Sequence, residues 1–340
     1  SATCVTGLTV RSTAHDFNRV GQLVILLLIQ LGGIGIMTVT TFVTFQWRVR
    51  QGIRERALIA ETLGESGETD LRKVLVRVLR WTAIREAIGA VVLVLRFQAE
   101  QSPVAACWQA LFTSVSAFCN AGFALHDDSL TAYQGDWIVN PAIMMLVVTG
   151  GIGYPVLVDV ARSWSRDPRR MWEKLMLHSK IMLTGSAVLI AIGAIAFLVF
   201  ESDGVLASMP YSRRVIVAMF HSVSCRTAGF NTVDLGSLTN ATLFVSILLM
   251  IVGAGPCSTG GGFKVSTLTV LLLRAWATLT GRTQVRISRR TLPPSVVERA
   301  MVTAIVFTAV AVTALAILLA LEQSSCLLYT SDAADDSVLV

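Results

Sequence analysis

Charged residues are scarce in this sequence: Asp, Glu, Lys and Arg together make up 15% of its 340 residues. Soluble domains carry about 25% charged residues, so the shortage argues against a soluble enzyme and against a disordered chain. Hydrophobic residues instead reach 54%, and they gather in runs long enough to cross a bilayer. The composition therefore predicts an all-α polytopic membrane protein.

Histidine and cysteine are also few, with four and six residues respectively. No two cysteines form a CxxC pair, and no histidine lies near them at the spacing of zinc ligands. A cysteine-rich disulfide framework is not typical of so apolar a chain. The hydrophobic runs hold no aspartate pair, Ser/His pair or HExxH motif, so a membrane-embedded enzyme is a disfavoured alternative. We expect no catalytic residue and no bound cofactor in this chain.

Six stretches are long and apolar enough to span a membrane. They lie at roughly 20–46, 74–97, 137–160, 176–200, 239–274 and 298–321. The stretch 239–274 is too long for one straight helix and contains a glycine-rich break. Two shorter semi-apolar segments, 104–118 and 215–224, suit helices that enter the membrane and stop halfway.

The positive charges follow the predicted spans. Segments 48–80, 162–180 and 274–299 hold 20 of the 28 Lys and Arg residues, and they alternate with acidic segments. Under the positive-inside rule these basic segments are cytoplasmic. The net charge of +6 then reflects membrane topology, and we expect no nucleic-acid partner. The opposite side collects acidic residues that would modestly raise the local cation concentration: Asp127, Asp128, Asp136, Glu201, Asp203 and Asp234.

An internal repeat is the clearest pattern in the chain. Segment 110–123 matches 218–230 with one residue skipped, and the opening segment 1–8 matches 116–123. Gly7, Gly122 and Gly229 are therefore equivalent, at spacings of 115 and 107 residues. A second glycine-rich landmark follows each of them, at 31–35, 149–153 and 252–255.

The repeated unit is a spanning helix, a short re-entrant helix, a glycine loop and a second spanning helix. A helix that stops inside the membrane leaves carbonyl groups without helical partners, and its carbonyl end favours cations. Glycine lets the next carbonyls point inward, so several such loops around one axis predict a carbonyl-lined cation filter. A single Thr-Ala-Gly-Phe string would only indicate a turn. We interpret the glycines of the second landmark as sites of close helix packing: Gly32, Gly33, Gly35, Gly150, Gly151 and Gly153.

These motifs resemble the Trk/Ktr/HKT superfamily of potassium transporters. The resemblance covers roughly residues 1–321 and rests on the strings at 4–8, 116–123, 226–231 and 255–264. It implies four helix–pore-loop–helix units around a single pore, as in potassium channels. It also implies a filter formed by the repeat glycines and the residues before them: Thr6, Gly7, Ala121, Gly122, Ala228 and Gly229.

Glycine at every filter position goes with potassium in this superfamily, and serine at the first goes with sodium. All three positions are glycine here, which favours potassium. A sodium-permeable or sodium/potassium-cotransporting member is the alternative.

The segment 253–263 lies too soon after Gly229 to be a fourth filter, so we interpret it as an intramembrane loop that interrupts the second helix of the third unit. The resemblance implies that this loop is the gate. Its residues are Gly255, Pro256, Ser258, Thr259, Gly260, Gly261 and Gly262. Three charges are expected near the pore: Arg226, Lys264 and Arg274. We expect Arg226 to hold the third filter loop through Asp234 or Glu201.

The repeat divides the chain into the end of a first unit, two further units and the first helix of a fourth. Their bounds are 1–47, 74–160, 176–275 and 298–321, followed by a compositionally foreign tail at 322–340. The chain is thus expected to be a truncated fragment without a fourth filter. The resemblance further implies a homodimer in the bacterial cytoplasmic membrane, with lipids around it and a cytosolic ring of regulatory subunits. That ring would bind the nucleotide, NAD or ATP/ADP, and the transported ion is K⁺.

Overall fold

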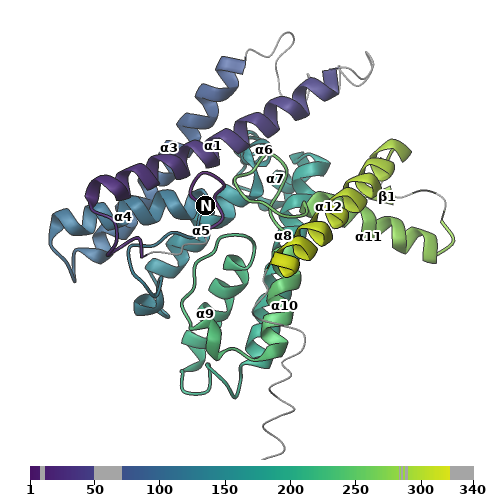
Figure 1. Ribbon diagram of the computed structural model, residues 1–340. Helices are drawn as coiled ribbons and strands as arrows, with labels where there is room; N and C mark the ends of the chain where they lie inside the picture. Colours follow the sequence, from purple (N-terminus) through teal and green to yellow (C-terminus); the bar gives the residue numbers. More distant parts are fainter. Residues whose placement is uncertain (8–11, 50–70, 283, 285, 288–289, 322–340) are drawn as a thin grey trace, which may run out of the picture. The chain divides into compact units, whose positions relative to one another are not determined.

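The computed structural model of the chain is almost wholly helical (Figure 1) and describes residues 1–7, 12–49, 71–282, 284, 286–287 and 290–321. It divides into two compact units, Ser1–Thr269 and Val270–Val340. In the first unit the helices are α1 (Arg19–Val49), α3 (Leu71–Phe97), α4 (Pro103–Phe118), α5 (Val139–Ile152), α6 (Tyr154–Arg162), α7 (Pro168–Lys174), α8 (Leu177–Phe200), α9 (Tyr211–Ser224) and α10 (Asn240–Ile251), with short 3₁₀ turns at Thr131–Tyr133 and Leu235–Ser237.

Helix α11 (Val265–Leu279) crosses the boundary, and α12 (Pro294–Leu321) lies in the second unit. There Val270 and Ala277 of α11 pack against Val297 and Ala300 of α12. Between these helices, strands β1 (Arg286–Ile287) and β2 (Arg290–Thr291) pair antiparallel. The all-α prediction is confirmed for the described residues, apart from this two-residue ladder.

The helices coincide with the predicted spans. By length and composition, Arg19–Val39, Leu177–Phe200 and Pro294–Ile317 can each cross a membrane, and α5 with α6 forms a fourth candidate bent by 101°. Helix α3 covers the predicted span 74–97, and the predicted stretch 239–274 is divided between α10 and α11. The two segments expected to enter and stop halfway are α4 and α9.

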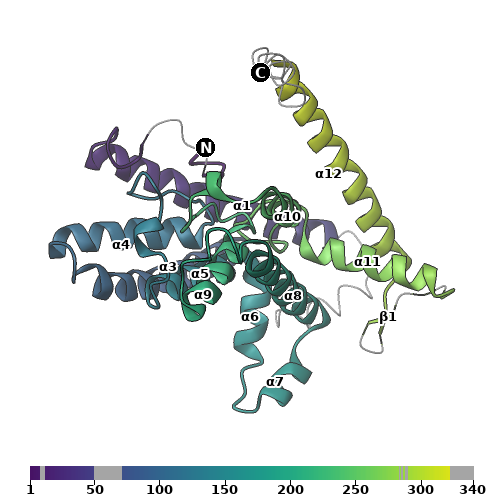
Figure 2. The same ribbon diagram turned by 90° about the horizontal axis from the view of Figure 1, so that it is seen from below.

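Each of these two shorter helices packs along the long helix that precedes it: α4 lies along α3, and α9 lies along α8 (Figures 1 and 2). Helix α5 contacts α3, α4 and α9, so it joins the two pairs. One hydrophobic core includes buried side chains from α1, α3, α4 and α5, among them the fully buried Phe97 and Phe112. Val5, Ala121 and Ala228, which flank the repeat glycines, belong to the same core.

Local sequence sets the start of these helices. Pro103 occupies the first turn of α4, where its missing N–H costs no hydrogen bond. Thr239 precedes α10, and its hydroxyl accepts a hydrogen bond from the Thr242 backbone N–H. Gly153 ends α5 with φ 99° and ψ 144°, a backbone conformation that only glycine adopts readily. Figure 2 shows α6 turning sharply away from α5 at this point.

Candidate functional site

The three repeat glycines share one backbone conformation. Gly7, Gly122 and Gly229 have φ values of 73°, 72° and 79°. Two residues before each glycine stands a second left-handed residue, and these are Val5, Asn120 and Thr227, with φ values of 54°, 55° and 68°. Non-glycine residues rarely adopt positive φ, so three matching pairs identify three copies of one specific loop.

The three loops converge. A Cβ atom added to Gly7 would lie 2.6 Å from the Ala121 carbonyl oxygen. One added to Gly122 would lie 2.9 Å from the Ala228 carbonyl oxygen. One added to Gly229 would lie 3.1 Å from the Gly122 Cα. The Ala121 and Ala228 carbonyl groups of the second and third loops thus lie beside the glycine of the preceding repeat, and the five predicted residues Gly7, Ala121, Gly122, Ala228 and Gly229 lie together.

Thr6 is exposed, unlike Ala121 and Ala228 at the equivalent positions of the other two loops. Its hydroxyl donates to the Ser1 carbonyl oxygen at 3.3 Å and lies 3.1 Å from the Ser1 hydroxyl. Ala121 and Ala228 are fully buried instead. At this position the first loop is held by hydrogen bonds to Ser1, and the second and third loops are held by burial in the core.

The second glycine landmark explains how the loops are supported. A Cβ on Gly32 would lie 2.1 Å from the Thr3 carbonyl oxygen, and a Cβ on Gly150 would lie 1.9 Å from that of Phe118. Thr3 and Phe118 are equivalent in the repeat, since each stands four residues before its loop glycine. In the first two repeats the second helix therefore touches the backbone just before the glycine loop, and only glycine permits that approach. The close-packing interpretation is confirmed for these two glycines.

Gly33 and Gly151 also face loop residues. A Cβ on Gly33 would lie 2.7 Å from the Cys119 Sγ atom, and one on Gly151 would lie 3.2 Å from the Asn120 side-chain amide. The last glycine of the landmark behaves differently in the two repeats. Gly35 lies inside the unbroken α1 with no atom within 4 Å of its Cβ position, whereas Gly153 breaks the helix. Close helix packing is therefore the wrong interpretation for Gly35 and Gly153.

The predicted interruption of the third unit is confirmed, because the chain between α10 and α11 is not helical. Ser258 and Thr259 are buried there. The Thr259 hydroxyl donates to the Phe118 carbonyl oxygen at 3.1 Å. Cβ atoms on Gly260 would lie 2.9 Å from the Thr227 hydroxyl and 3.0 Å from the Asn120 amide. The intramembrane loop 253–263 thus lies against the second and third filter segments.

Two basic side chains donate hydrogen bonds to this loop. The buried Arg226 donates from Nη2 to the Gly253 carbonyl oxygen at 3.3 Å, and Lys264 donates from Nζ to that of Gly260 at 2.9 Å. The expected pairing of Arg226 with Asp234 or Glu201 is wrong, because its guanidinium donates instead to the Gly253 carbonyl oxygen of the neighbouring loop. Arg274 lies in the part of α11 that belongs to the second unit.

The acidic residues expected at the outer surface mostly serve as structural acceptors. The buried Glu201 accepts from the Thr239 N–H and hydroxyl, both at 2.9 Å, and from the Thr242 hydroxyl at 2.6 Å. Asp234 accepts from the Gly236 N–H at 3.0 Å. These carboxylates hold helix starts and turns, and the expectation that they raise the local cation concentration stays a prediction.

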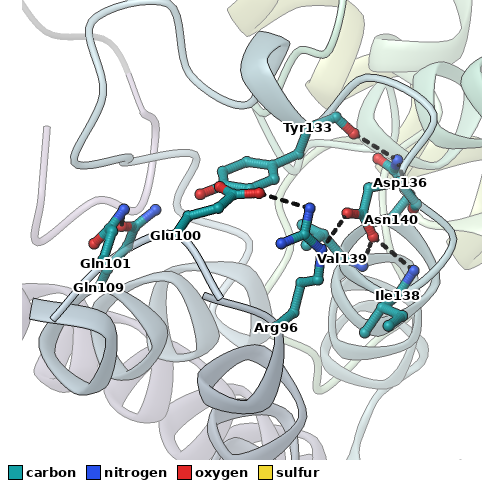
Figure 3. Close-up of polar contacts among 9 residues, drawn as sticks. All are labelled: Arg96, Glu100, Gln101, Gln109, Tyr133, Asp136, Ile138, Val139 and Asn140. Carbon is teal, nitrogen blue, oxygen red and sulfur yellow. Dashed lines mark hydrogen bonds and ion pairs between the residues drawn. The ribbon is translucent and has the colours of Figure 1, made fainter. Parts of the chain in front are cut away.

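Asp136 joins two helices of the second repeat, α3 and α5 (Figure 3). It accepts from the N–H groups of Ile138 and Val139 at the start of α5, at 2.8 and 3.0 Å, and from Arg96 Nε at 2.7 Å. Arg96 also pairs with Glu100 at 2.7 Å. Burial alone would raise the pKa of Asp136, but the two backbone N–H groups and the guanidinium hold that pKa below its ordinary value. The end of α3 is thereby fixed to the start of α5.

Sequence reasoning missed a polar cluster behind the second loop. The buried Glu86 of α3 accepts from the Gln30 side-chain nitrogen at 2.9 Å, and its backbone carbonyl accepts from the Ser114 hydroxyl at 2.7 Å. The Cys119 thiol lies 3.7 Å from the Gln30 side-chain oxygen. An acidic residue within an apolar helix was the available signal, since such a group needs partners inside the protein. The cluster links α1, α3 and α4 behind the loop.

A second cluster of this kind supports the third loop. His221 of α9 lies 2.9 Å from the Ser246 hydroxyl of α10 and 3.4 Å from the Cys225 Sγ atom at the end of its own helix. The expectation that His221 is a packing residue is confirmed, since its ring also lies 4.4 Å from that of Phe197.

These features define a class: an α-helical membrane protein built from pore-loop units, with glycine loops that converge on one point. The chain matches the model of the TrkH family, described as cation transport protein, over residues 1–327. The chain belongs to this family of cation transporters, which are not enzymes.

Several relatives are similar over most of the chain. Ktr system potassium uptake protein B of Vibrio alginolyticus is 36% identical over 327 residues, covering 96% of this chain and 71% of the relative. Potassium/sodium uptake protein NtpJ of Enterococcus hirae is 34% identical over 302 residues, covering 88% and 66%. The crystal structure of the potassium transporter TrkH from Vibrio parahaemolyticus matches with a TM-score of 0.69 at 21% identity, over 94% of this chain and 63% of that one. The similarity to this crystal structure supports the fold described above for the present chain.

Proposed function

We propose that this chain lines the pore of a potassium uptake protein in the bacterial cytoplasmic membrane, and that carbonyl groups at Gly7, Gly122 and Gly229 form its filter. The convergence of these three loops carries the proposal. An ion that leaves water needs oxygen ligands in place of its hydration shell. Helices α4 and α9 end at Phe118 and Ser224, just before their loops, so the negative ends of their dipoles favour a cation there.

Potassium is favoured over sodium as the transported ion. All three loop positions are glycine, and the similar protein of Vibrio alginolyticus is named for potassium uptake. The name of the Enterococcus hirae protein adds sodium, which keeps sodium permeation or cotransport as the second candidate. The chain itself supplies ligands from its backbone and needs no cofactor for this task.

The unit boundaries that we propose follow the repeat: 1–47, 74–160, 176–275 and 298–321. The tail 322–340, proposed as foreign sequence, lies outside the described residues. A fourth glycine loop would complete the filter.

We propose that the intramembrane loop 253–263 is the gate. Its burial beside Asn120 and Thr227 supports this role, because a segment there can obstruct an ion that leaves the filter. The cations Arg226 and Lys264 donate to the loop's own carbonyl groups. They thereby hold the loop in place and lower its attraction for a passing ion.

We also propose that the protein forms a homodimer surrounded by membrane lipids. This homodimer would bind a cytosolic ring of subunits that carry NAD or ATP/ADP. The basic segments 48–73, 162–174 and 282–290 would contact that ring or lipid headgroups. Much of the first and third segments lies outside the described residues.

Potassium uptake is testable by genetic complementation. Expressed at full length in a bacterium that lacks its own potassium uptake systems, the protein is expected to restore growth at low potassium. Growth and initial rubidium or potassium uptake are the measurements. The empty vector is the control, and sodium-dependent growth without potassium uptake would favour the second candidate. Absence of growth despite a normal amount of protein in the membrane would contradict the proposal.

Shortening the loop tests the gate. Removal of residues 254–262 from the full-length protein is expected to increase initial potassium uptake severalfold, because the obstructing segment and its hydrogen bonds are lost. Potassium flux into proteoliposomes is the measurement, with melting temperature as the check of folding. Equal or lower flux in a folded variant would show that the loop does not gate.

A further inference from the structure

The break between α5 and α6 lies directly against the intramembrane loop. Three backbone hydrogen bonds join them. The Gly255 N–H donates to the Gly151 carbonyl oxygen at 2.8 Å, the Thr259 N–H donates to that of Gly150 at 3.3 Å, and the Tyr154 N–H donates to that of Cys257 at 3.1 Å. Carbonyl and N–H groups that the helix break leaves without helical partners are therefore paired by the loop. Unpaired groups of this kind are costly inside a membrane.

The surfaces on either side of these bonds fit closely. A Cβ atom on Gly153 would lie 2.4 Å from the Pro256 carbonyl oxygen, and one on Gly255 would lie 2.4 Å from the Ile152 carbonyl oxygen. Either side chain would separate the break from the loop. Gly153 would also be strained, because its φ of 99° is one that L-residues avoid.

Apolar contacts join the same elements. Ile152 and Val156, from the two sides of the break, share a buried cluster with Met182 of α8 and Val265 of α11. Val252, at the other end of the loop, packs against this cluster. Both ends of the loop and the start of α6 are thus held by one set of side chains.

We propose that the α5–α6 break is the dock of the intramembrane loop, and that Gly153 is the positioning residue that fixes the closed loop. This inference rests on the proposed gate function and assigns the gate's partner within the fold. It makes the second repeat part of the gate, although the gating segment belongs to the third. Movement of α6 changes the loop's hydrogen bonds directly, so the cytoplasmic segment that follows α6 has a physical route to the gate.

The test is Gly153→Ala in the full-length protein. Strain of the size carried by a residue in this backbone region shifts the balance between docked and displaced loop by roughly 10-fold. Initial potassium uptake is therefore expected to rise severalfold with unchanged potassium-over-sodium selectivity. Gly35→Ala is the matched control, because it is the same change at the equivalent position of the first repeat with no atom within 4 Å. Its uptake should equal that of the unmodified protein.

A second variant identifies the contact. Gly255→Ala alters the opposite side of the same interface and should have the same effect as Gly153→Ala. Both changes separate the same two surfaces. The increase in potassium uptake in the double variant should therefore be smaller than the product of the two single-variant increases. The proposal would be overturned if the uptake increase of the double variant equalled the product of the two single increases. It would also be overturned if Gly153→Ala took up potassium at the same rate as Gly35→Ala.

A thiol measurement separates this inference from the proposed function. Cys257 lies buried in the loop, so displacement of the loop should accelerate its reaction with a maleimide in native membranes. The background carries serine at Cys4, Cys107 and Cys326, and the labelled peptides are identified by mass spectrometry. Labelling of Cys257 in Gly153→Ala supports the dock, even where the unmodified protein moves no potassium and the transport proposal fails.

The buried Cys119 and Cys225 thiols control for folding. Their simultaneous reaction would mean general unfolding, and the conclusion then rests on Gly255→Ala, in which Cys257 alone should react. If Cys257 stays protected in both variants while uptake is normal, the loop is held by something other than the α5–α6 break.

Discussion

Gly122→Ser in the full-length protein is expected to lower potassium-over-sodium selectivity by about tenfold, which corresponds to about 1.4 kcal/mol. The Cβ atom would lie 2.9 Å from both the Ala228 carbonyl oxygen and the Gly229 Cα. The third loop would have to move away, so the carbonyl groups of two repeats would no longer present the same spacing to an ion. A filter that ranks ions by its carbonyl ligands loses discrimination when their arrangement changes. Competitive rubidium and sodium uptake measures the effect.

Gly281→Ser is the matched control for backbone strain. Gly281 has φ 69°, close to the 72° of Gly122, but no atom lies within 4 Å of its Cβ position. The control therefore carries the same strain in open space, and its selectivity should be unchanged. Unchanged selectivity in Gly122→Ser, or an equal loss in Gly281→Ser, would refute the filter assignment.

Gly150→Ala is expected to destabilise the folded protein by about 3 kcal/mol, the upper part of the range for overpacking a well-packed interior. Its Cβ would lie 1.9 Å from the Phe118 carbonyl oxygen, and neither backbone can yield without moving the second loop. Gly32→Ala should have a similar effect, because its Cβ would lie 2.1 Å from the equivalent Thr3 oxygen. Thermal unfolding of the purified protein, together with the selectivity assay, measures both variants.

Gly35→Ala supplies a comparison of opposite sign. It lies inside α1 with open space at its Cβ position, so the substitution should leave stability unchanged or raise it by about 0.5–1 kcal/mol through the higher helix preference of alanine. Wild-type stability in Gly150→Ala would show that α5 and the backbone of α4 are not in the contact described here.

The sequence predicted the helices and the three loops, because hydrophobic length and a triple repeat are properties of the chain itself. It could not predict the outcome at Gly153. The string Gly-Gly-Ile-Gly occurs at both 32–35 and 150–153, yet α1 continues through the first and the helix breaks at the second. The difference comes from a neighbour, since loop atoms of the third unit lie at Gly153 and no atom lies at Gly35.

Partners of buried polar groups were equally hidden from the sequence. Arg226 was expected to find a carboxylate and instead donates to the Gly253 carbonyl oxygen. Glu86 was not expected to take part in loop support, yet it binds Gln30 beside Cys119. Both outcomes depend on which distant segments meet, and the acidic residues near Arg226 in the sequence were already engaged as acceptors for helix starts and turns.

The three loops also differ in what surrounds them, although their backbones match. Thr6 is exposed, and Ala121 and Ala228 are buried. The second helix is continuous in the first repeat, broken at Gly153 in the second and interrupted by the loop 253–263 in the third. In an assembly of identical subunits, a mutation would alter every wall of the pore at once. Here the copies lie in one gene and each wall can change alone. Natural selection can therefore assign ion choice to one copy and the on–off response to another.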